Sequence, residues 1–315
     1  MNSTFGSNYF GFKKVQQANL LPKISLNNTA KIPTHKYLYD NIRKGYSLTR
    51  KKTENNAKYV ILKNETEESI KKVIYYIHGG NYVKGLTTTY ESLVYPLCDI
   101  SDDIQVILLD YSLAPNYKYP TQLDEAFDVW NELTKEFTPE DIIIGGDSSG
   151  GHLALSLVEK IQKDKNESPK SAFFISPWID MTCSGKSYFT NYQKDIVLGD
   201  PNKPLTKENL EELKNSEMFC FIGYANRNDP YVSPLFGDYT KFPNSLFIVG
   251  DNEILLDDTL NMVKKLKENG HKVKLYKKEG MSHNFPLYLN FMQDGFEAFI
   301  TIKDFIVDSF EFESM

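Results

Sequence analysis

Residues 142–151 read Ile-Ile-Ile-Gly-Gly-Asp-Ser-Ser-Gly-Gly, an apolar run that ends in glycines around a central serine. Gly146 and Gly150 flank Ser148 in the pattern Gly-x-Ser-x-Gly. Glycines let the chain turn sharply from a strand into a helix, so that the serine hydroxyl projects above the sheet. Backbone N–H groups at the start of that helix, beginning with Ser149, would face a negative charge on a bound carbonyl. The stretch therefore makes Ser148 the candidate nucleophile.

A glycine-rich turn of this kind could instead bind phosphate. A dinucleotide-binding fingerprint needs a glycine where Ser148 stands. A P-loop ends in Gly-Lys-Ser or Gly-Lys-Thr, whereas this loop ends in Gly-Gly-His at residues 150–152. Both differences favour a nucleophile over a phosphate site, and a plain structural turn stays an alternative.

A second glycine motif lies upstream, where residues 73–82 read Val-Ile-Tyr-Tyr-Ile-His-Gly-Gly-Asn-Tyr. An oxyanion needs two or three preorganised donors, and small residues let backbone N–H groups approach it closely. We therefore expect an oxyanion hole formed by the N–H groups of Gly80, Asn81 and Ser149. Gly79 is a further candidate if the register of the loop differs by one. A simple turn at the end of a strand would explain the motif without catalysis.

A serine nucleophile also needs a base and a carboxylate, which follow such a turn in the order serine, acid, histidine. Of the five histidines, only His271 and His283 lie in the required C-terminal region. His283 occupies a loop after a short strand-like run, whereas His271 follows a helical segment, where a cation complements the helix dipole. We therefore predict that His283 is the base.

Together, the motifs resemble the hormone-sensitive lipase group of α/β-hydrolases, which includes many microbial carboxylesterases. Residues 78–80, His-Gly-Gly, are similar to the family's His-Gly-Gly-Gly, and residues 146–151 are similar to its Gly-Asp-Ser-Ala-Gly-Gly. Other segments that resemble family motifs and follow the family's order are residues 110–115, 119–120, 176–178, 229–235, 253–258 and 283–285. The resemblance spans about residues 70–310.

The chain departs from the family's pattern at three places. Asn81 replaces the third glycine of the oxyanion loop, and Ser149 replaces the alanine after the nucleophile. At the acid position, usually Asp-Pro-Leu-x-Asp-Asp, residues 253–258 read Glu-Ile-Leu-Leu-Asp-Asp. Glu253 therefore aligns with the acid and is our prediction for it. Asp251, which falls two residues too early, is the alternative.

The composition excludes several classes of protein. A chain of 315 residues with 20 Tyr and 20 Phe can bury one large core. Its formal net charge of −6 argues against nucleic-acid binding. No apolar run approaches the length of a membrane span, and the N-terminus lacks a signal pattern, so we expect a cytoplasmic protein. The three widely spaced cysteines predict buried or half-buried free thiols.

Strand-like and helical segments alternate, which predicts an α/β-hydrolase fold with a mostly parallel central sheet and helices on both faces. Strands are expected at 59–62, 73–77, 104–109, 142–144, 172–175, 246–249 and 273–276, and helices at 90–98, 123–137, 152–163, 257–269 and about 290–310. Right-handed crossovers place the carboxyl ends of these strands on one edge. We expect His78, Ser148, Glu253 and His283 to meet there.

Two polar segments interrupt this alternation. The second contains an expected helix at 207–215 and a run at 218–224 that is too apolar to stay in water. We expect an N-terminal cap segment at 1–45 and a helical cap insertion at 180–225. The hydrolase core would then comprise residues 46–179 and 226–315.

The predicted mechanism is ester hydrolysis through an acyl-enzyme, with Ser148 as nucleophile, His283 as base and Glu253 orienting the imidazole. The resemblance implies a serine carboxylesterase for small, short-acyl esters. We expect no cofactor, no metal and no nucleic-acid partner, and a homodimer stays open. The alternatives are an amide, formamide or sugar-acetyl hydrolase with the same triad, and a non-catalytic binding protein, as in hormone receptors that resemble these enzymes.

Overall fold

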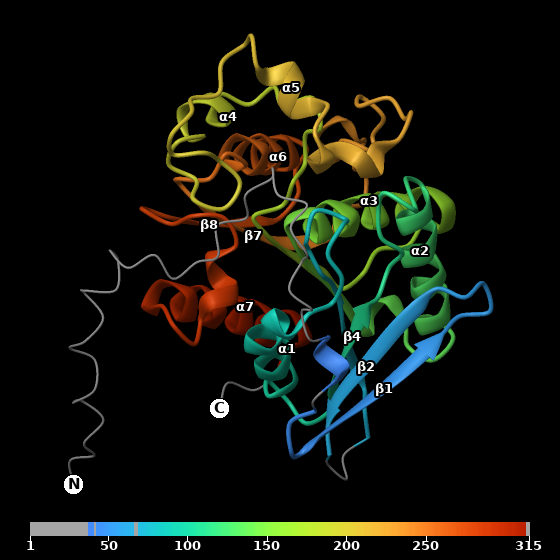
Figure 1. The fold of residues 1–315 in the computed structure, drawn as a ribbon. Helices are drawn as coiled ribbons and strands as arrows, with labels where there is room; N and C mark the ends of the chain where they lie inside the picture. The colour runs from blue at the N-terminus through green and yellow to red at the C-terminus, as the bar shows by residue number, and fades with distance from the viewer. Residues whose placement is uncertain (1–36, 41, 66–68, 313–315) are drawn as a thin grey trace, which may run out of the picture. The chain divides into compact units, whose positions relative to one another are not determined.

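The protein is described by a computed structural model that covers residues 37–40, 42–65 and 69–312. Eight strands form one sheet in the order β1-β2-β4-β3-β5-β6-β7-β8 (Figure 1). The strands are β1 Tyr46–Lys52, β2 Lys58–Asn64, β3 Lys72–Ile77, β4 Ile104–Leu109, β5 Ile142–Asp147, β6 Ser171–Ile175, β7 Asn244–Gly250 and β8 Val273–Lys278. Only the β1–β2 and β2–β4 pairs are antiparallel. All other neighbouring strands run parallel, which confirms the expected sheet.

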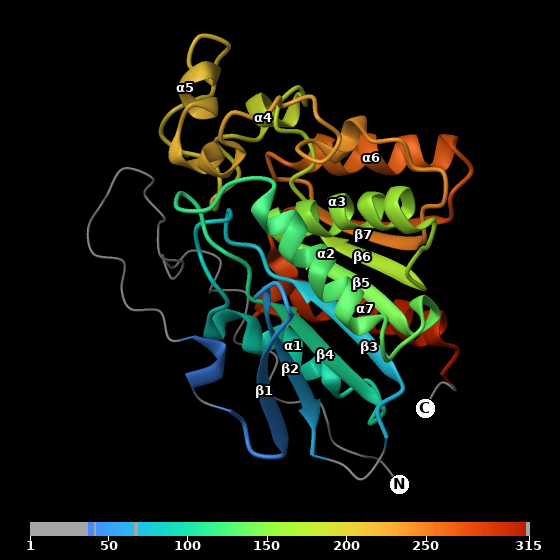
Figure 2. The same ribbon diagram turned by 90° about the vertical axis from the view of Figure 1, so that its right-hand side faces the viewer.

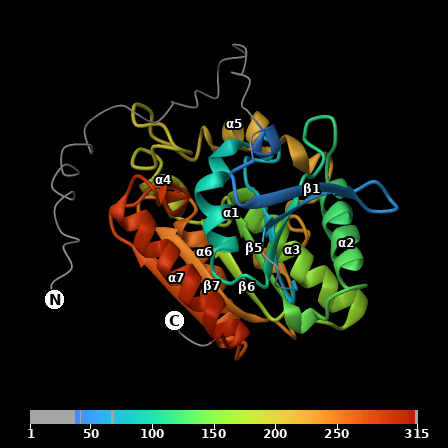
Figure 3. The ribbon, with the colours of Figure 1, turned by 90° about the horizontal axis from the view of Figure 1, so that it is seen from below.

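Helices cover both faces of the sheet, as Figures 2 and 3 show. The helices α1 Glu91–Cys98 and α7 Gln293–Phe310 lie on one face, and their apolar side chains share one core cluster with β4. The helices α2 Thr121–Leu133, α3 Ser148–Lys165 and α6 Leu256–Glu268 lie on the other face and share a second cluster. The strand β4 is buried along its whole length, and all of its residues except Gln105 are apolar, as expected of a strand covered on both sides.

All seven expected strands are confirmed, and each of the five expected core helices overlaps an observed one. The strand β1 was not expected, because its sequence Tyr-Ser-Leu-Thr-Arg-Lys-Lys has too few apolar residues. It pairs with β2 along one side only and lies at the edge of the sheet, where solvent accepts polar side chains. Hydrophobic alternation is therefore a weak signal for this strand.

The segment 180–225 contains α4 Ser187–Thr190, α5 Leu210–Lys214 and the 3-10 helix η5 Glu217–Ile222. The helix expected at 207–215 is confirmed in a shorter form as α5. Phe219 and Phe221 are buried and pack against Trp178, which explains the apolar run. The remaining 3-10 helices are η2 Leu38–Asp40, η3 Thr88–Tyr90, η4 Pro139–Asp141, η6 Pro234–Phe236 and η7 Phe285–Tyr288. Most of the N-terminal segment 1–45 lies outside the described residues.

Two further expectations concern the cysteines and the membrane. Cys98 and Cys183 are buried, Cys220 is half-buried, and all three are free, so the prediction of unpaired thiols is confirmed. Within the described part of the chain, no helix is both long enough and apolar enough to cross a bilayer.

Candidate active site

Ser148 stands at the turn between β5 and α3. The strand ends at Asp147, the helix begins at Ser148, and the serine has a φ of 52°, a conformation that side chains rarely adopt. The flanking glycines permit the turn because neighbouring backbone leaves no room for a side chain. A Cβ atom at Gly150 would overlap the carbonyl oxygen of Ile77, and one at Gly146 would overlap the carbonyl oxygen of Gly150. The structure thus explains both glycines of the Gly-x-Ser-x-Gly pattern.

His283 lies directly against this serine. Ser148 Oγ is 2.9 Å from His283 Nε2, and 135 residues separate the two in the sequence. His283 is carried by the loop after β8, and its side chain is only 3% exposed. With Nδ1 protonated, Nε2 can accept the hydroxyl proton of Ser148.

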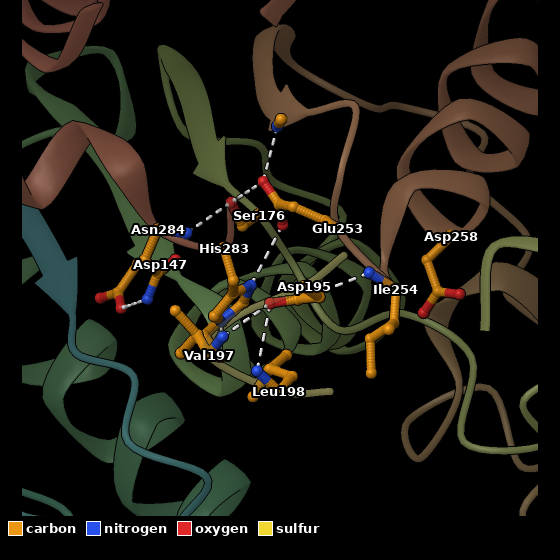
Figure 4. A network of polar contacts seen from close by, with 12 residues as sticks. Asp147, Ser176, Asp195, Val197, Leu198, Glu253, Ile254, Asp258, His283 and Asn284 are labelled. Atoms are coloured by element: carbon orange, nitrogen blue, oxygen red, sulfur yellow. Dashed lines mark hydrogen bonds and ion pairs between the residues drawn. The ribbon is translucent and has the colours of Figure 1, made fainter. Parts of the chain in front are cut away.

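Glu253, rather than Asp251, lies on the other side of the imidazole. His283 Nδ1 donates to Glu253 Oε2 at 3.1 Å. The second oxygen, Oε1, accepts from Ser176 Oγ at 2.7 Å and from the backbone N–H of Gly250 at 2.6 Å (Figure 4). Asp251 instead accepts from the backbone N–H of Gly280 at 2.7 Å. The carboxylate that contacts the imidazole is therefore that of Glu253, two residues after Asp251.

Burial and charge act in opposite directions on the pKa of His283. Burial favours the neutral imidazole and lowers the pKa, but the hydrogen bond and charge of Glu253 outweigh it, with help from Asp195 and Asp147. The pKa of His283 is therefore raised above its ordinary value. Burial raises the pKa of Glu253, while the hydrogen bond and charge of His283 and the N–H of Gly250 oppose that rise.

The loop after β3 turns backbone N–H groups toward the same edge. Gly80 and Asn81 both have positive φ values, 108° and 58°. The N–H groups of Gly80, Asn81 and Ser149 donate to no acceptor in the described part of the chain. The N–H of Gly79 differs, because it donates to Asp147 Oδ1 at 2.9 Å. Gly79, the further candidate for an oxyanion donor, therefore has no free N–H to offer.

Asp147 connects the three loops of the site. Besides the N–H of Gly79, its carboxylate accepts from Tyr76 OH at 2.8 Å, from Tyr90 OH at 3.3 Å and from Asn284 Nδ2 at 2.8 Å. Figure 4 shows the contact between Asn284 and Asp147. Because Asn284 follows His283 and Asp147 precedes Ser148, this one buried carboxylate holds the oxyanion loop and the histidine loop beside the serine. Buried carboxylates persist when hydrogen bonds satisfy their oxygens, and here four donors do so.

The other described histidines have structural partners. His78 and His152 are fully buried, and burial lowers the pKa of each to about 4, so both are neutral. His152 accepts from the Tyr82 hydroxyl and donates to the carbonyl oxygen of Val232. His271 bonds through Nε2 to the carbonyl oxygen of Tyr239, and no contact with Ser148 is present. Over residues 37–312, outside the gaps noted above, no group of three or more His, Cys, Asp or Glu could hold a metal ion.

A mostly parallel sheet with serine, histidine and carboxylate meeting at its strand ends defines an α/β-hydrolase. A model of the α/β-hydrolase fold matches residues 74–287 of the chain. An esterase of Acinetobacter venetianus is 32% identical over 242 residues, which is 76% of each chain. The chain therefore belongs to the α/β-hydrolase family, in its hormone-sensitive lipase-like group of esterases.

Further relatives agree with this family. The ethyl acetate hydrolase of Pseudomonas putida is 26% identical over 243 residues, covering 73% of this chain and 70% of its own. The structure of an esterase from the bacterial hormone-sensitive lipase family matches with a TM-score of 0.75 at 25% identity, covering 86% of both chains. A hormone-sensitive lipase from a metagenome library matches with a TM-score of 0.74 at 26% identity and the same coverage. The chain is a carboxylic ester hydrolase.

Several residues of the site escaped the sequence analysis as functional residues. Asp147, Ser176 and Asn284 belong to the quoted motifs, but the sequence alone assigns them no role; Asp147 ends β5, Ser176 directly follows β6, and Asn284 lies in the loop after β8. The available signal was the strand-end position of Asp147 and Ser176 and the place of Asn284 next to His283. Asn191 and Asp195 also contact the site, and they lie in a segment without periodicity that gave no signal.

Proposed function

We propose that the chain hydrolyses small carboxylic esters through an acyl-enzyme, with Ser148 as nucleophile, His283 as base and Glu253 as the carboxylate partner. The observation that carries this proposal is the continuous hydrogen-bond chain from Ser148 Oγ through the imidazole to Glu253. Each link lies within hydrogen-bond reach, as nucleophilic catalysis requires.

In the first half-reaction, Ser148 Oγ attacks the ester carbonyl carbon while His283 Nε2 takes the hydroxyl proton. The carbonyl electron pair moves onto oxygen, and the N–H groups of Gly80, Asn81 and Ser149 stabilise that charge. As the tetrahedral intermediate collapses, the C–O bond to the alcohol breaks, and His283 gives its proton to the leaving oxygen. Water then repeats the sequence on the acyl-enzyme and releases the carboxylic acid.

We propose short-acyl esters as the substrate class, because relatives are named acetyl-hydrolase and ethyl acetate hydrolase. The test is kcat/KM for a series of p-nitrophenyl esters with increasing acyl length, alongside a matched p-nitroanilide. We expect the highest kcat/KM for acyl chains of about two to four carbons, and weaker activity on the anilide. A preference for the anilide would move the proposal to an amide hydrolase, and a maximum at long acyl chains would contradict the substrate class.

The raised pKa of His283 predicts how activity depends on pH. Below that pKa the imidazole is protonated, so Nε2 cannot accept the proton of Ser148, and kcat/KM should fall about tenfold per pH unit. We expect the midpoint of this acid limb to lie above the ordinary histidine pKa of about 6.5. The measurement is kcat/KM against pH with an ester that does not ionise.

The matched control for this profile is Glu253→Gln, which removes the anion next to the imidazole. Because that anion favours the imidazolium, its loss should shift the acid limb of the residual activity to lower pH. A wild-type limb centred below about 6.5, or an unchanged limb in the variant, would contradict the assignment of His283 and Glu253.

We also propose a helical cap over the site, formed by residues 180–225; the N-terminal segment 1–45, which the sequence also assigns to the cap, lies mostly outside the described residues. Support comes from Asn191 and Asp195, which place part of the segment 180–225 against the loop that carries Glu253.

A cytoplasmic location is proposed because three free thiols suit a reducing compartment. A homodimer is proposed from the exposed Phe291, Met292 and Phe296 near the start of α7.

A further inference from the structure

The loop that carries Glu253 comprises residues 251–255 and joins β7 to α6. We call it the acid loop. One side is held by the histidine loop, since the N–H groups of Asp251 and Asn252 donate to the carbonyl oxygens of Lys278 and Met281 at 3.0 and 3.1 Å. The other side faces residues 187–195 of the cap insertion. The contacts between residues 187–195 and the acid loop therefore help to set the position of the Glu253 carboxylate.

Asn191 binds two carbonyl groups of the acid loop with one side-chain nitrogen. Its Nδ2 donates to the carbonyl oxygen of Asp251 at 2.9 Å and to that of Glu253 at 2.8 Å. The side-chain oxygen faces away and accepts from Lys194 Nζ at 3.4 Å, which fixes the orientation of the amide. Asn191 is only 4% exposed, so solvent cannot replace these bonds. The amide therefore fixes the backbone carbonyl groups of Asp251 and Glu253, and with them the part of the acid loop that carries the Glu253 side chain.

Asp195 binds the N–H side of the same peptide unit, the one between Glu253 and Ile254. Its Oδ2 accepts from the N–H of Ile254 at 3.0 Å, directly after Glu253. Its Oδ1 accepts from the N–H groups of Val197 and Leu198 at 3.0 and 3.1 Å, so the carboxylate is itself held within the cap insertion. Figure 4 shows Asp195 between the acid loop and residues 197–198, close to His283. Asp195 is fully buried.

We infer that Asn191 and Asp195, here called the cap clamp, are positioning residues that set the place of Glu253 Oε2 against His283. The inference rests on the proposed roles of Ser148, His283 and Glu253. Neither clamp residue touches the imidazole through a hydrogen bond, and both bind the backbone that carries the acid. The charge of Asp195 also raises the pKa of His283, so Asn191, which carries no charge, is the cleaner test of positioning. The cap insertion thereby takes part in the chemistry of the core.

The first test is Asn191→Asp, a change of nearly equal size. A carboxylate cannot donate, so one oxygen would face the carbonyl oxygens of Asp251 and Glu253 and push the acid loop away. If the Glu253 carboxylate is displaced by about 1 Å, kcat should fall on the order of 10²-fold. KM should change little, because Asn191 is buried and bonds to the acid loop. The matched control is Asn209→Asp, because Asn209 bonds only within the cap insertion, to Thr206 and Pro204.

The second test is Asp195→Asn, which keeps one acceptor oxygen but places an amide nitrogen against a backbone N–H. We expect a smaller loss of kcat, on the order of tenfold. Its control is Asp200→Asn, since Asp200 accepts from the N–H of Asn202 and reaches no part of the acid loop. Should Asn191→Asp fail to fold, as judged by its thermal unfolding midpoint, Asp195→Asn takes its place in the cycle described next.

A double-mutant cycle with Glu253→Gln separates positioning from general support of the fold. If the cap clamp acts through the acid, its loss should matter little once the carboxylate is gone, and the double variant should match Glu253→Gln within a few-fold. If the losses multiply, the cap clamp acts elsewhere and the inference is overturned. Wild-type kcat in both clamp variants would overturn it too. Full activity in Glu253→Gln alone would instead refute the proposed triad.

Discussion

Replacement of Ser148 by alanine should lower kcat by about 10⁶-fold, the loss seen when a serine hydrolase is deprived of its nucleophile. Without Oγ, His283 Nε2 has no hydroxyl to deprotonate, and no acyl-enzyme can form. The fold should persist, because Oγ contributes one hydrogen bond, to His283, and the turn is fixed by Gly146 and Gly150. The measurement is kcat with a saturating short-acyl ester, together with the thermal unfolding midpoint.

The control for this change is Ser156→Ala on the same helix. Ser156 is also buried, and its Oγ donates to the carbonyl oxygens of His152 and Tyr231 rather than to an imidazole. Its loss should cost about 1 kcal/mol of stability and leave kcat near the wild-type value. Retention of more than about a tenth of wild-type activity in Ser148→Ala would reject Ser148 as the nucleophile.

The strands were predictable because buried strands consist mainly of apolar residues, which can be recognised in the sequence. Strands such as β4 and β5 are buried on both faces, so most of their residues are apolar, and glycines stand where the backbone turns tightly after Ile144. Because β3 to β8 run parallel, their carboxyl ends lie at one edge of the sheet. For this reason, residues as distant as 148 and 283 could be placed at one edge before any contact was known.

Features that depend on polar contacts between distant segments were not predictable. The N–H of Gly79 is taken by Asp147, and a sequence cannot show which of two neighbouring N–H groups a buried carboxylate will bind. Asn191 and Asp195 lie in a stretch with no repeating pattern, and their role arises only from packing against the acid loop. The edge strand β1 was not predicted, because many of its side chains are exposed to solvent and leave no apolar pattern in the sequence.

The choice between Glu253 and Asp251 as the acid could be predicted only in part from the sequence. Counting within the motif at residues 253–258 favours Glu253, but loop geometry can shift such a count by two residues. In the structure, the backbone bonds of Asp251 turn its side chain toward Gly280, 2.7 Å from that N–H. Glu253 points inward, and the donors Ser176 and Gly250 on its other oxygen aim the free oxygen at the imidazole. These contacts predict that substitution of Glu253 lowers kcat far more than substitution of Asp251.

Glu253→Gln should lower kcat by about 10⁴-fold, because an amide neither holds the imidazole in the productive tautomer nor stabilises the imidazolium. The amide fits the same space, so KM and the unfolding midpoint should change little by comparison. Asp251→Asn is the matched control, since its side chain contacts Gly280 and no atom of His283, and kcat should stay within a few-fold of wild type. If Asp251→Asn lost the greater activity, the acid would be Asp251, and the hydrogen bond between His283 Nδ1 and Glu253 would be structural rather than catalytic.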